Sequence, residues 1–434
     1  MSESRTCPAP TKPVQIAPIE LPVTGEVGRR SAHSPTSSGT VHAMVTSPAM
    51  TTHWLLEVHV EAFPPPVVLP SEAEVVVIGG GLMGVSTTYW LARLGVNVLL
   101  VEAHQLAWGA TGRNAGLMLA GATPLESPEL VRTVLREEGI NAEYTEPGHL
   151  ALASSPEILD KIHREASQRG ATSAPVYALD HSACEDLLVM RINTRFLGGR
   201  WFPGGGMIHP TRFVYGLARA ALRRGAFLAT QTSVLKVSPI EGQESIDVCT
   251  SRGGIRTRQV VFACSTSINE FLPDFRKVIT LVRGQVMSTQ SLPEMFRIGL
   301  AVDWGTVYWR QTADGVVVLG GCRNLDPIAE TGAQVLVNQR IQDALAHFLP
   351  DAFPGFPTFR IGQRWAGIMD YPVDGRPIVG ALPHAPNQWI IAGFGGHGMP
   401  AGLGAGKAIA ETIATGRAPA ALEPFDPGRF EKEG

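Results

Sequence analysis

The chain has 434 residues, which is too long for one small core and indicates two domains or one large composite domain. Its formal net charge of −3 offers no basic surplus for nucleic acid or an anionic membrane, and no apolar run approaches the roughly 18 residues that span a bilayer. The five cysteines lie far apart, so we expect neither disulfides nor a metal site, and a reducing, cytoplasmic location.

Residues 1–50 contain no aromatic residue and are rich in Pro, Ser and Thr, which predicts a disordered leader. The pair Arg29-Arg30 is followed by SAHSPTSSGT rather than an apolar core, so it does not predict an export signal. Two origins of the leader stay open: it belongs to the natural protein, or translation starts at Met44 or Met50.

The segment 74–103 reads EVVVIGGGLMGVSTTYWLARLGVNVLLVEA. Its apolar run 75–78 predicts a buried parallel strand. Apolar residues at helical spacing follow a glycine turn, Gly95 ends the predicted helix, and NVLLVEA predicts a second strand that closes in Glu102. The turn matches the pattern GxGxxG through Gly79, Gly81 and Gly84.

This strand–turn–helix–strand–acid order predicts a dinucleotide site. Glycines allow a tight turn and a close approach of the backbone to a pyrophosphate, and the helix that begins at Leu82 and Met83 directs its partial positive charge at that anion. Glu102, with Ala103 beside it, can accept hydrogen bonds from a ribose 2′-hydroxyl, and it would repel the 2′-phosphate of NADP.

The segment 109–118, GATGRNAGLM, indicates whether the dinucleotide is FAD or NAD. It has small residues, one arginine and one asparagine where an NAD dehydrogenase continues with helix and strand. The segment resembles the flavin-binding loop of the D-amino-acid oxidase superfamily, which contains glycine oxidase and sarcosine oxidase, and most closely that of its gamma-glutamylputrescine oxidase branch. The resemblance implies that FAD lies along this backbone, with Arg113 and Asn114 near the flavin ring and with the small residues Ala110, Thr111, Gly112 and Ala115.

The resemblance covers roughly residues 52–425 and implies an α/β fold. We expect a Rossmann-like FAD-binding domain and a second, mostly antiparallel β-sheet substrate domain, as in D-amino-acid oxidase. Trp54 is expected to pack on the core. The predicted division is a leader 1–50, FAD-binding segments 51–150, 201–272 and 356–434 with the C-terminal helix, and substrate-domain segments 151–200 and 273–355.

Two later stretches complete the expected cofactor site. The strands TSVLKV and QVVFACSTSI imply adenosine contacts from Val234 and Ala263, although the turn ACSTS departs from the family pattern and leaves open whether Ala263 or Ser265 makes the contact. WIIAGFGGHGMPAG is a strand, a glycine turn and a helix, and the family aims this helix at the flavin N1–C2=O edge. The residues expected there are Gly396, His397, Gly398 and Met399, and the candidate catalytic residues are His397, Arg113 and Asn114.

The predicted substrate-binding region includes residues 280–322. Their pattern predicts antiparallel strands with a hairpin turn at Asp314-Gly315. Period two puts Tyr308 and Arg310 on one face of a strand and Trp309 on the other. The candidate substrate-binding residues are Tyr308, Arg310, Trp365 and Met369, of which Tyr308 and Trp365 could form an aromatic wall.

Departures from the family inform the chemistry. Gly367 stands where sarcosine oxidase carries its flavin-anchoring cysteine, and the loop offers Arg113 and Asn114 where the dimethylglycine dehydrogenase type has a histidine, so we expect non-covalent FAD. Met369 stands where an arginine clamps the substrate carboxylate in glycine oxidase, which favours an amine, although Arg310 or Arg283 could supply a clamp.

The resemblance therefore predicts an FAD-dependent oxidase of a primary or secondary amine. Hydride passes from the substrate to flavin N5, the product is an imine, and O2 is reduced to H2O2. The alternative is an FAD-dependent amino-acid or imino-acid dehydrogenase or oxidase with an α-carboxylated substrate. A flavin-binding protein without turnover and an NAD dehydrogenase are disfavoured by GATGRNAG and GFGGHG, and the oligomeric state stays open.

Overall fold

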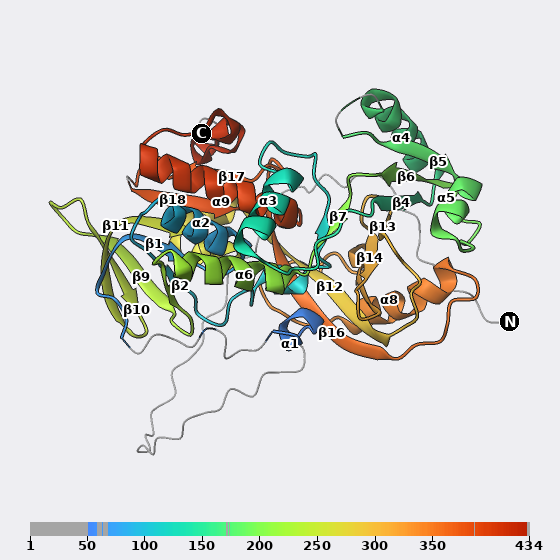
Figure 1. Ribbon diagram of the computed structural model, residues 1–434, viewed down its shortest axis with the longest axis horizontal. Coiled ribbons are helices and arrows are strands. Elements are labelled where there is room, and N and C mark those ends of the chain that lie inside the picture. Colours follow the sequence, from blue (N-terminus) through green and yellow to red (C-terminus); the bar gives the residue numbers. More distant parts are fainter. Residues whose placement is uncertain are drawn as a thin grey trace, which may run out of the picture.

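The computed structural model describes residues 51–58, 63, 68–170, 172, 174–385 and 387–431. The predicted leader 1–50 lies outside these residues. Within them, two eight-stranded sheets occupy the two halves of the molecule (Figure 1). A two-stranded ladder of β3 (Leu117–Met118) and β7 (Gly206–Met207) lies between the two halves.

The first sheet has a parallel centre. Its strand order is β17-β18-β11-β1-β2-β8, and the pairs β18–β11, β11–β1, β1–β2 and β2–β8 are all parallel. The continuous apolar strands explain this arrangement, because a parallel sheet is buried on both faces. The strands are β1 (Glu72–Ile78), β2 (Val98–Val101), β8 (Phe227–Ala229), β11 (Gly253–Phe262), β17 (Ile378–Ala381) and β18 (Gln388–Ala392).

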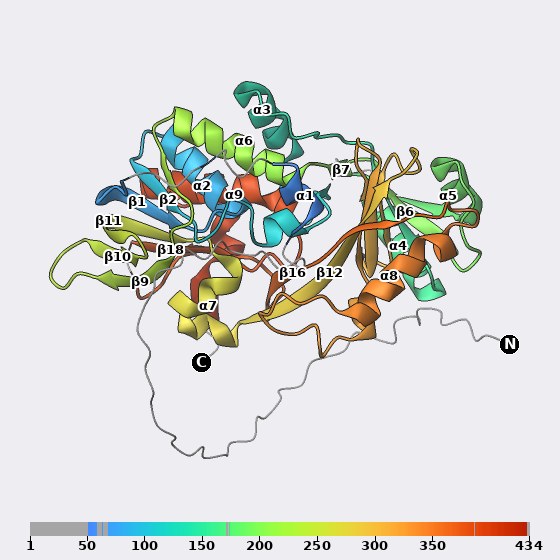
Figure 2. The same ribbon diagram turned by 90° about the horizontal axis from the view of Figure 1, so that it is seen from below.

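Helices cover one face of this sheet and a β-ribbon covers the other (Figure 2). Helix α2 (Leu82–Arg93) packs between α6 (Pro210–Arg223) and α9 (Gly398–Thr415) on the first face. The ribbon on the second face consists of β9 (Val234–Pro239), β10 (Ile246–Thr250) and the start of β11, with α7 (Ile268–Phe271) beside it. Helix α3 (Pro128–Glu138) packs on α6 and α9.

The second sheet is mostly antiparallel and has the order β16-β12-β15-β14-β13-β4-β6-β5, with one parallel pair, β13–β4. Helix α8 (Gln339–Ala352) packs on it around the fully buried Trp309, and α4 (Pro156–Arg169) and α5 (His181–Leu188) lie near β5 and β6. The strands are β4 (His149–Ala153), β5 (Tyr177–Asp180), β6 (Gly198–Phe202), β12 (Ile279–Ser291), β13 (Gly299–Val302), β14 (Val307–Gln311), β15 (Val316–Gly321) and β16 (Ile361–Pro372).

This architecture confirms the predicted fold class. The predicted first strand and helix are β1 and α2, the Asp314-Gly315 hairpin joins β14 to β15, and Trp54 is fully buried. The exact division into domain segments stays a prediction. Strand β16 pairs with β12 in the second sheet, although its residues fall in the segment 356–434 that was assigned to FAD binding.

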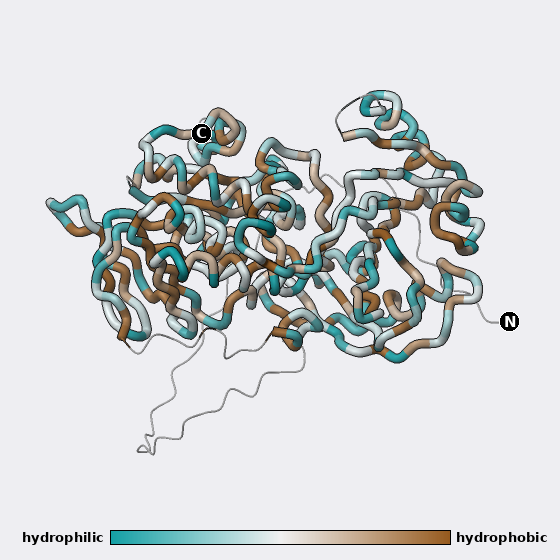
Figure 3. Tube along the Cα trace, in the orientation of Figure 1, coloured by the Kyte–Doolittle hydropathy of each residue, from teal (hydrophilic) through white to brown (hydrophobic). Residues whose placement is uncertain are grey.

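Hydrophobic residues follow the strands (Figure 3), and the buried clusters also include residues of α2, α6, α8 and α9. Among the described residues, no helix is both long enough and apolar enough to span a bilayer.

Candidate functional site

The glycine turn after β1 is packed so closely that side chains are excluded from it. Gly79 has a φ of +114°, and a Cβ there would lie 2.5 Å from the Ala263 carbonyl oxygen. A Cβ on Gly84 would lie 1.9 Å from the Gly79 carbonyl oxygen. Helix α2 starts directly after this turn with Gly81 as its N-cap, which offers no side chain to cap the helix. Its first N–H groups and its positive dipole end are therefore suited to an anion.

Glu102 follows β2 and lies beside the same turn. Its Oε2 accepts a hydrogen bond from the Gly80 N–H at 2.6 Å, and its Oε1 accepts one from the His104 N–H at 2.7 Å. Burial is the main cause that raises the pKa of Glu102. The neighbouring Ala103 is exposed, and the backbone bond from the Thr232 N–H to the Glu102 carbonyl brings the start of β9, and thus Val234, toward this edge.

The predicted flavin loop forms a short 3-10 turn, η3 (Ala110–Arg113), against the start of α2. The Leu82 N–H donates to Thr111 Oγ1 at 3.0 Å. The Asn114 side chain binds the loop itself: its Nδ2 donates to the Ala110 and Thr111 carbonyls at 3.1 and 2.8 Å, and its Oδ1 accepts from the Gly116 N–H at 2.7 Å. Asn114 therefore fixes the backbone conformation of the loop.

Arg113 lies buried between the loop and the second sheet. Its Nε donates to the Trp108 carbonyl at 2.9 Å, and its Nη1 donates to the Ala366 carbonyl at 3.0 Å. A Cβ on Gly367 would lie 2.9 Å from the Cβ of Arg113, so the strand at this point leaves room only for glycine. Burial lowers the pKa of Arg113 to about 10, which keeps the guanidinium charged at neutral pH.

Three side chains from distant segments hold the loop backbone. Trp54 Nε1 donates to the Asn114 carbonyl at 2.6 Å, Trp365 Nε1 donates to the Arg113 carbonyl at 2.9 Å, and Thr52 Oγ1 donates to the Gly112 carbonyl at 2.8 Å. Both tryptophans are fully buried. The sequence predicts that Trp54 packs on the core. No local sequence pattern indicates the hydrogen bonds that Trp54 and Trp365 donate to the loop.

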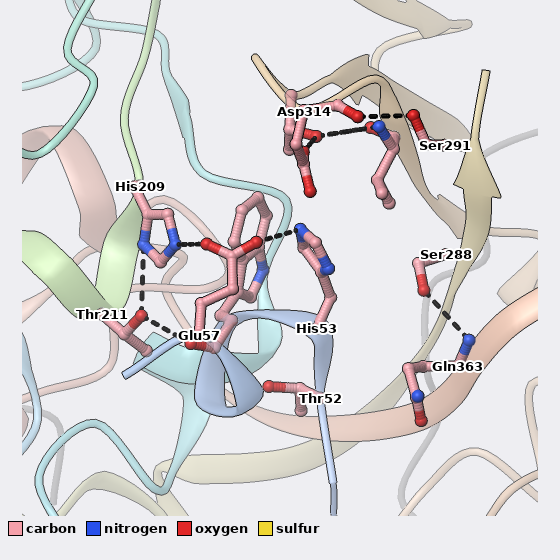
Figure 4. Close-up of polar contacts among 12 residues, drawn as sticks. Thr52, His53, Glu57, His209, Thr211, Ser288, Ser291, Asp314 and Gln363 are labelled. Atoms are coloured by element: carbon pink, nitrogen blue, oxygen red, sulfur yellow. Dashed lines mark hydrogen bonds and ion pairs between the residues drawn. The ribbon is translucent and has the colours of Figure 1, made fainter. Parts of the chain in front are cut away.

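The segment that carries Trp54 is anchored by an ionic cluster. Helix α1 (His53–Leu56) is followed by Glu57, which lies between His53 and His209 (Figure 4). Glu57 Oε2 is 2.7 Å from Nε2 of the buried His209, and Glu57 Oε1 is 3.1 Å from Nε2 of His53. His209 is the N-cap of α6, and Thr211 donates to the Trp54 carbonyl at 2.9 Å. This cluster connects α6 to the residues that support the flavin loop.

The second glycine turn leads into α9. Gly395 and Gly396 have φ angles of +54° and +88°, and His397 is the N-cap without a side-chain bond to the helix. His397 is exposed, with its Nδ1 3.3 Å from the Gly395 carbonyl oxygen, whereas Met399 is buried. The turn, with Gly398 at the helix start, presents backbone N–H groups and the positive end of an 18-residue helix.

Asp370 holds this turn in place and was not anticipated from the sequence as a site residue. Its Oδ2 accepts hydrogen bonds from the Gly393 N–H at 2.8 Å and from Ser265 Oγ at 3.0 Å. Its backbone carbonyl accepts from the Gly395 N–H at 2.9 Å. Burial raises the pKa of Asp370. The sequence around Asp370 gives no signal of these contacts, because Ser265 and Gly393 lie 105 and 23 residues away in the chain.

Alternate residues of β16 face both cofactor elements. Gly367 lies against Arg113, and a Cβ on Gly396 would lie 3.3 Å from Met369 Sδ and 3.5 Å from Tyr371 Oη. The Tyr371 hydroxyl is 3.8 Å from Met369 Sδ. The structure therefore brings Met369 to the second glycine turn and adds Tyr371, which was not predicted; the substrate-binding role of Met369 stays a prediction.

The two arginines expected as alternative clamps are occupied elsewhere. Arg310 is buried, donates through Nη1 to the Ile208 and Gly116 carbonyls at 2.9 and 3.3 Å, and lies 5.2 Å from the Trp54 ring centre. Arg283 pairs with the fully buried Glu330 at 3.1 Å. As predicted, Tyr308 lies on the same face as Arg310, and Trp309 packs on the opposite face in the core below α8.

The two turns and the loop suit FAD. Two N-terminal helix ends, at α2 and α9, and a buried cation, Arg113, offer complementary charge for a pyrophosphate and an electron-rich ring. At Gly79, Gly84 and Gly367 a Cβ would lie 2.5, 1.9 and 2.9 Å from protein atoms, so these glycines let the first turn, α2 and β16 pack closely around the site.

These features define a flavoprotein fold of the D-amino-acid oxidase type. The family model described as FAD dependent oxidoreductase (DAO) matches residues 74–412, and the chain belongs to this family. FAD is therefore its cofactor.

Individual relatives are distant. The chain is 26% identical over 449 residues to mitochondrial dimethylglycine dehydrogenase of Mus musculus, covering 96% of this chain but 49% of the relative. It is 23% identical to gamma-glutamylputrescine oxidoreductase of Escherichia coli, covering 78% of this chain and 83% of that one. L-proline dehydrogenase from P. horikoshii shares the fold, with a TM-score of 0.72, 22% identity, and coverage of 84% of this chain and 99% of that one. The chain thus spans about half the length of the dimethylglycine dehydrogenase that it resembles.

Proposed function

We propose that the protein is an FAD-dependent oxidase of a primary or secondary amine, which yields an imine and reduces O2 to H2O2. The observation that carries this proposal is the convergence of the flavin loop, the second glycine turn and one face of β16, where Met369 rather than an arginine adjoins Gly396. An apolar thioether at this place favours a neutral amine, which needs no counter-charge.

When bound, FAD accepts a hydride from the substrate carbon next to nitrogen and passes the electrons on. The chain contributes position and charge. The positive end of α9 and the buried Arg113 favour negative charge on the ring. Asn114, Trp54 and Trp365 keep the loop rigid, so Arg113 stays in place without reorganisation.

The exposed His397 at the N-terminus of α9 is a further candidate for a residue near the ring. No protein base is required if the amine arrives deprotonated. The proposal therefore assigns no acid–base pair, and it places Tyr308 and Met369 next to the substrate.

The test is anaerobic mixing of the purified holoprotein with a panel of amines, followed by admission of oxygen. Loss of the flavin's visible absorbance before oxygen, and its return together with stoichiometric peroxide afterwards, is the expected result. If the flavin is reduced but returns slowly in air and rapidly with a quinone, the protein is a dehydrogenase. If no amine or amino acid reduces the flavin, the proposed reaction is wrong.

A further inference from the structure

Three side chains of metal-binding types meet where helix α1 approaches the hairpin between β14 and β15. They are His53, Glu57 and Asp314, and one donor atom from each lies within 4.8 Å of the donor atoms of the other two. Figure 4 shows the three side chains directed at one another. In the part of the chain that the structure describes, this is the one group of three such side chains with this spacing.

The Nε2 atom of His53 is the donor atom that most needs a partner. It is buried and makes no hydrogen bond to any described residue. Glu57 Oε1 lies 3.1 Å from it, four residues further along the chain at the end of α1. Side chains four residues apart on a helix lie on one face, so both can bind the same ion. A buried polar atom without a hydrogen bond normally faces a water, a ligand or an ion.

The two carboxylates are already oriented by their neighbours. Glu57 Oε2 is 2.7 Å from Nε2 of the buried His209 and 3.3 Å from Arg212 Nη2, which leaves Oε1 for another partner. Asp314 accepts a hydrogen bond from Thr312 Oγ1. Such outer contacts fix the orientation of carboxylates that bind a metal ion.

One positive charge lies close to the group. The guanidinium of Arg310 acts electrostatically on His53 and on both carboxylates. It donates to the Ile208 and Gly116 carbonyls rather than to either carboxylate, so the oxygens that face His53 keep their capacity to bind a cation.

The spacing of the donor atoms suits a transition-metal ion. Nitrogen and oxygen ligands of Zn²⁺ lie about 2.0–2.2 Å from the metal, so neighbouring ligand atoms are roughly 3–3.5 Å apart. The 3.1 Å between His53 Nε2 and Glu57 Oε1 is in this range. Asp314 is exposed at the hairpin turn, so its side chain can close the remaining gap, and the ion can enter from solvent. An imidazole among the ligands favours Zn²⁺ over Mg²⁺ and Ca²⁺, which prefer oxygen ligands.

We propose that His53, Glu57 and Asp314 bind a divalent transition-metal ion of the Zn²⁺ type, with water completing the coordination. The ion joins α1, whose Trp54 holds the flavin loop, to the hairpin of the second sheet. Because the ligands come from distant segments, binding of the ion stabilises the fold and the retention of FAD. The inference does not depend on the proposed reaction, and without the ion Glu57 keeps its bond to His209.

The first test is a calorimetric titration of chelator-treated, untagged holoprotein with Zn²⁺. Asp314→Asn removes the charge of one ligand and keeps an Asn-Gly pair, which suits a hairpin turn as well as Asp-Gly does. We expect the wild type to bind one Zn²⁺ per chain that Asp314→Asn does not bind, or binds at least roughly tenfold more weakly.

His181→Gln is the matched control. His181 and Glu185 are another pair four residues apart, with 3.5 Å between Nε2 and Oε1, and among the described residues they belong to no group of three metal-binding side chains. This variant should bind Zn²⁺ as the wild type does. Equal binding of Zn²⁺ by the wild type and Asp314→Asn would overturn the proposed site.

The second test measures the melting temperature and the release of FAD with and without Zn²⁺, for the three proteins at equal initial FAD content. Zn²⁺ should raise the melting temperature and slow the release of FAD in the wild type and in His181→Gln, and it should do neither in Asp314→Asn. The same response in all three proteins would assign the effect to another place in the chain and would overturn the link between α1 and the hairpin.

Discussion

The Glu102 carboxylate binds the first glycine turn. We predict that it also binds the adenosine ribose of FAD. It accepts bonds from the Gly80 and His104 N–H groups beside the first turn. We expect Glu102→Ala to weaken FAD binding by about 10- to 100-fold, since a hydrogen bond to a charged group contributes roughly 1.5–3 kcal/mol. The measurement is a fluorescence titration of the apoprotein with FAD. Glu74→Ala, on an exposed position of β1, is the control, and equal affinities in both variants would show that Glu102 does not contact the cofactor.

From Glu102 we also predict that the affinity for FAD depends on pH. Burial raises the pKa of Glu102, so the carboxylate is protonated at a higher pH than an exposed glutamate. Protonation removes acceptor capacity for the ribose. FAD affinity of the wild type should therefore fall as the pH decreases toward this raised pKa, and Glu102→Gln, which cannot titrate, should show a flatter profile. Parallel profiles would assign the pH effect to another group.

From Gly367 and Asn114 we predict that FAD is bound without a covalent bond to the protein. Neither can form a covalent bond to flavin, and the contact of Arg113 with Gly367 leaves no space for a larger side chain. Precipitation of the holoprotein with acid should release all of the yellow colour into the supernatant. Colour that stays in the pellet would reveal a covalent attachment at another residue.

At the scale of elements, α1 is held on α6 through Glu57. The hydrogen bond from His209 is the main cause that lowers the pKa of Glu57. Because its folded pKa is depressed, Glu57 contributes stability above its unfolded value, near pH 4.5, and this contribution is lost as the pH falls through the lower folded pKa. Glu57→Ala should lower the free energy of unfolding by about 1.5–3 kcal/mol at neutral pH, because it leaves the buried His209 without its acceptor.

Thermal or denaturant unfolding at pH 7 and near pH 4 checks this prediction. The difference between Glu57→Ala and the wild type should shrink at the acidic pH. Glu241→Ala, on an exposed turn, should match the wild type at both pH values. A destabilisation of Glu57→Ala that is the same at both pH values would mean that packing, and not the ion pair, holds α1 in place.

The elements with local signals could be predicted and those that depend on distant pairing could not. The glycine turn after β1, the start of α6 at Pro210 and the turn at Gly315 follow from short-range rules of the chain. The bond from Trp365 to the flavin loop and that from Ser265 to Asp370 span 252 and 105 residues. They arise because β16 passes between the flavin loop and the second glycine turn, a neighbourhood that no local pattern encodes.

The same limit explains why the contacts of Arg310 could not be predicted from the sequence. Period two correctly places Arg310 and Tyr308 on one face of β14, but it does not reveal that the Arg310 guanidinium lies under Trp54. The contacts of a side chain can be determined only when the turn that carries it and the strand beside it are both known.

At the scale of the whole molecule, the elements predicted to bind FAD lie where the two sheets meet. The first sheet supplies the two glycine turns through β1 and β18, and the second supplies β16, whose Gly367 and Trp365 contact the loop residue Arg113. We therefore expect substrate selection to depend on the second sheet and cofactor binding mainly on the first. Substitutions at Tyr371 or Met369 should for this reason change substrate preference more than FAD content.

We predict that residues 1–50 are dispensable, because the contacts that hold the flavin loop from the N-terminal side come from residues 51–58. Thr52, Trp54 and Glu57 bind the flavin loop and α6, whereas the first 50 residues contain no aromatic side chain and can bury little. A chain that starts at Met50 should therefore match the full chain in FAD content, turnover and melting temperature. A chain that starts at Val58 lacks the Trp54 and Thr52 bonds to the loop, and it should bind FAD more weakly and melt at a lower temperature. Both chains are compared by the ratio of flavin to protein absorbance and by thermal unfolding. Loss of FAD already in the Met50 chain would mean that the leader contributes to the site, and full FAD retention in the Val58 chain would mean that the loop holds its conformation without Trp54.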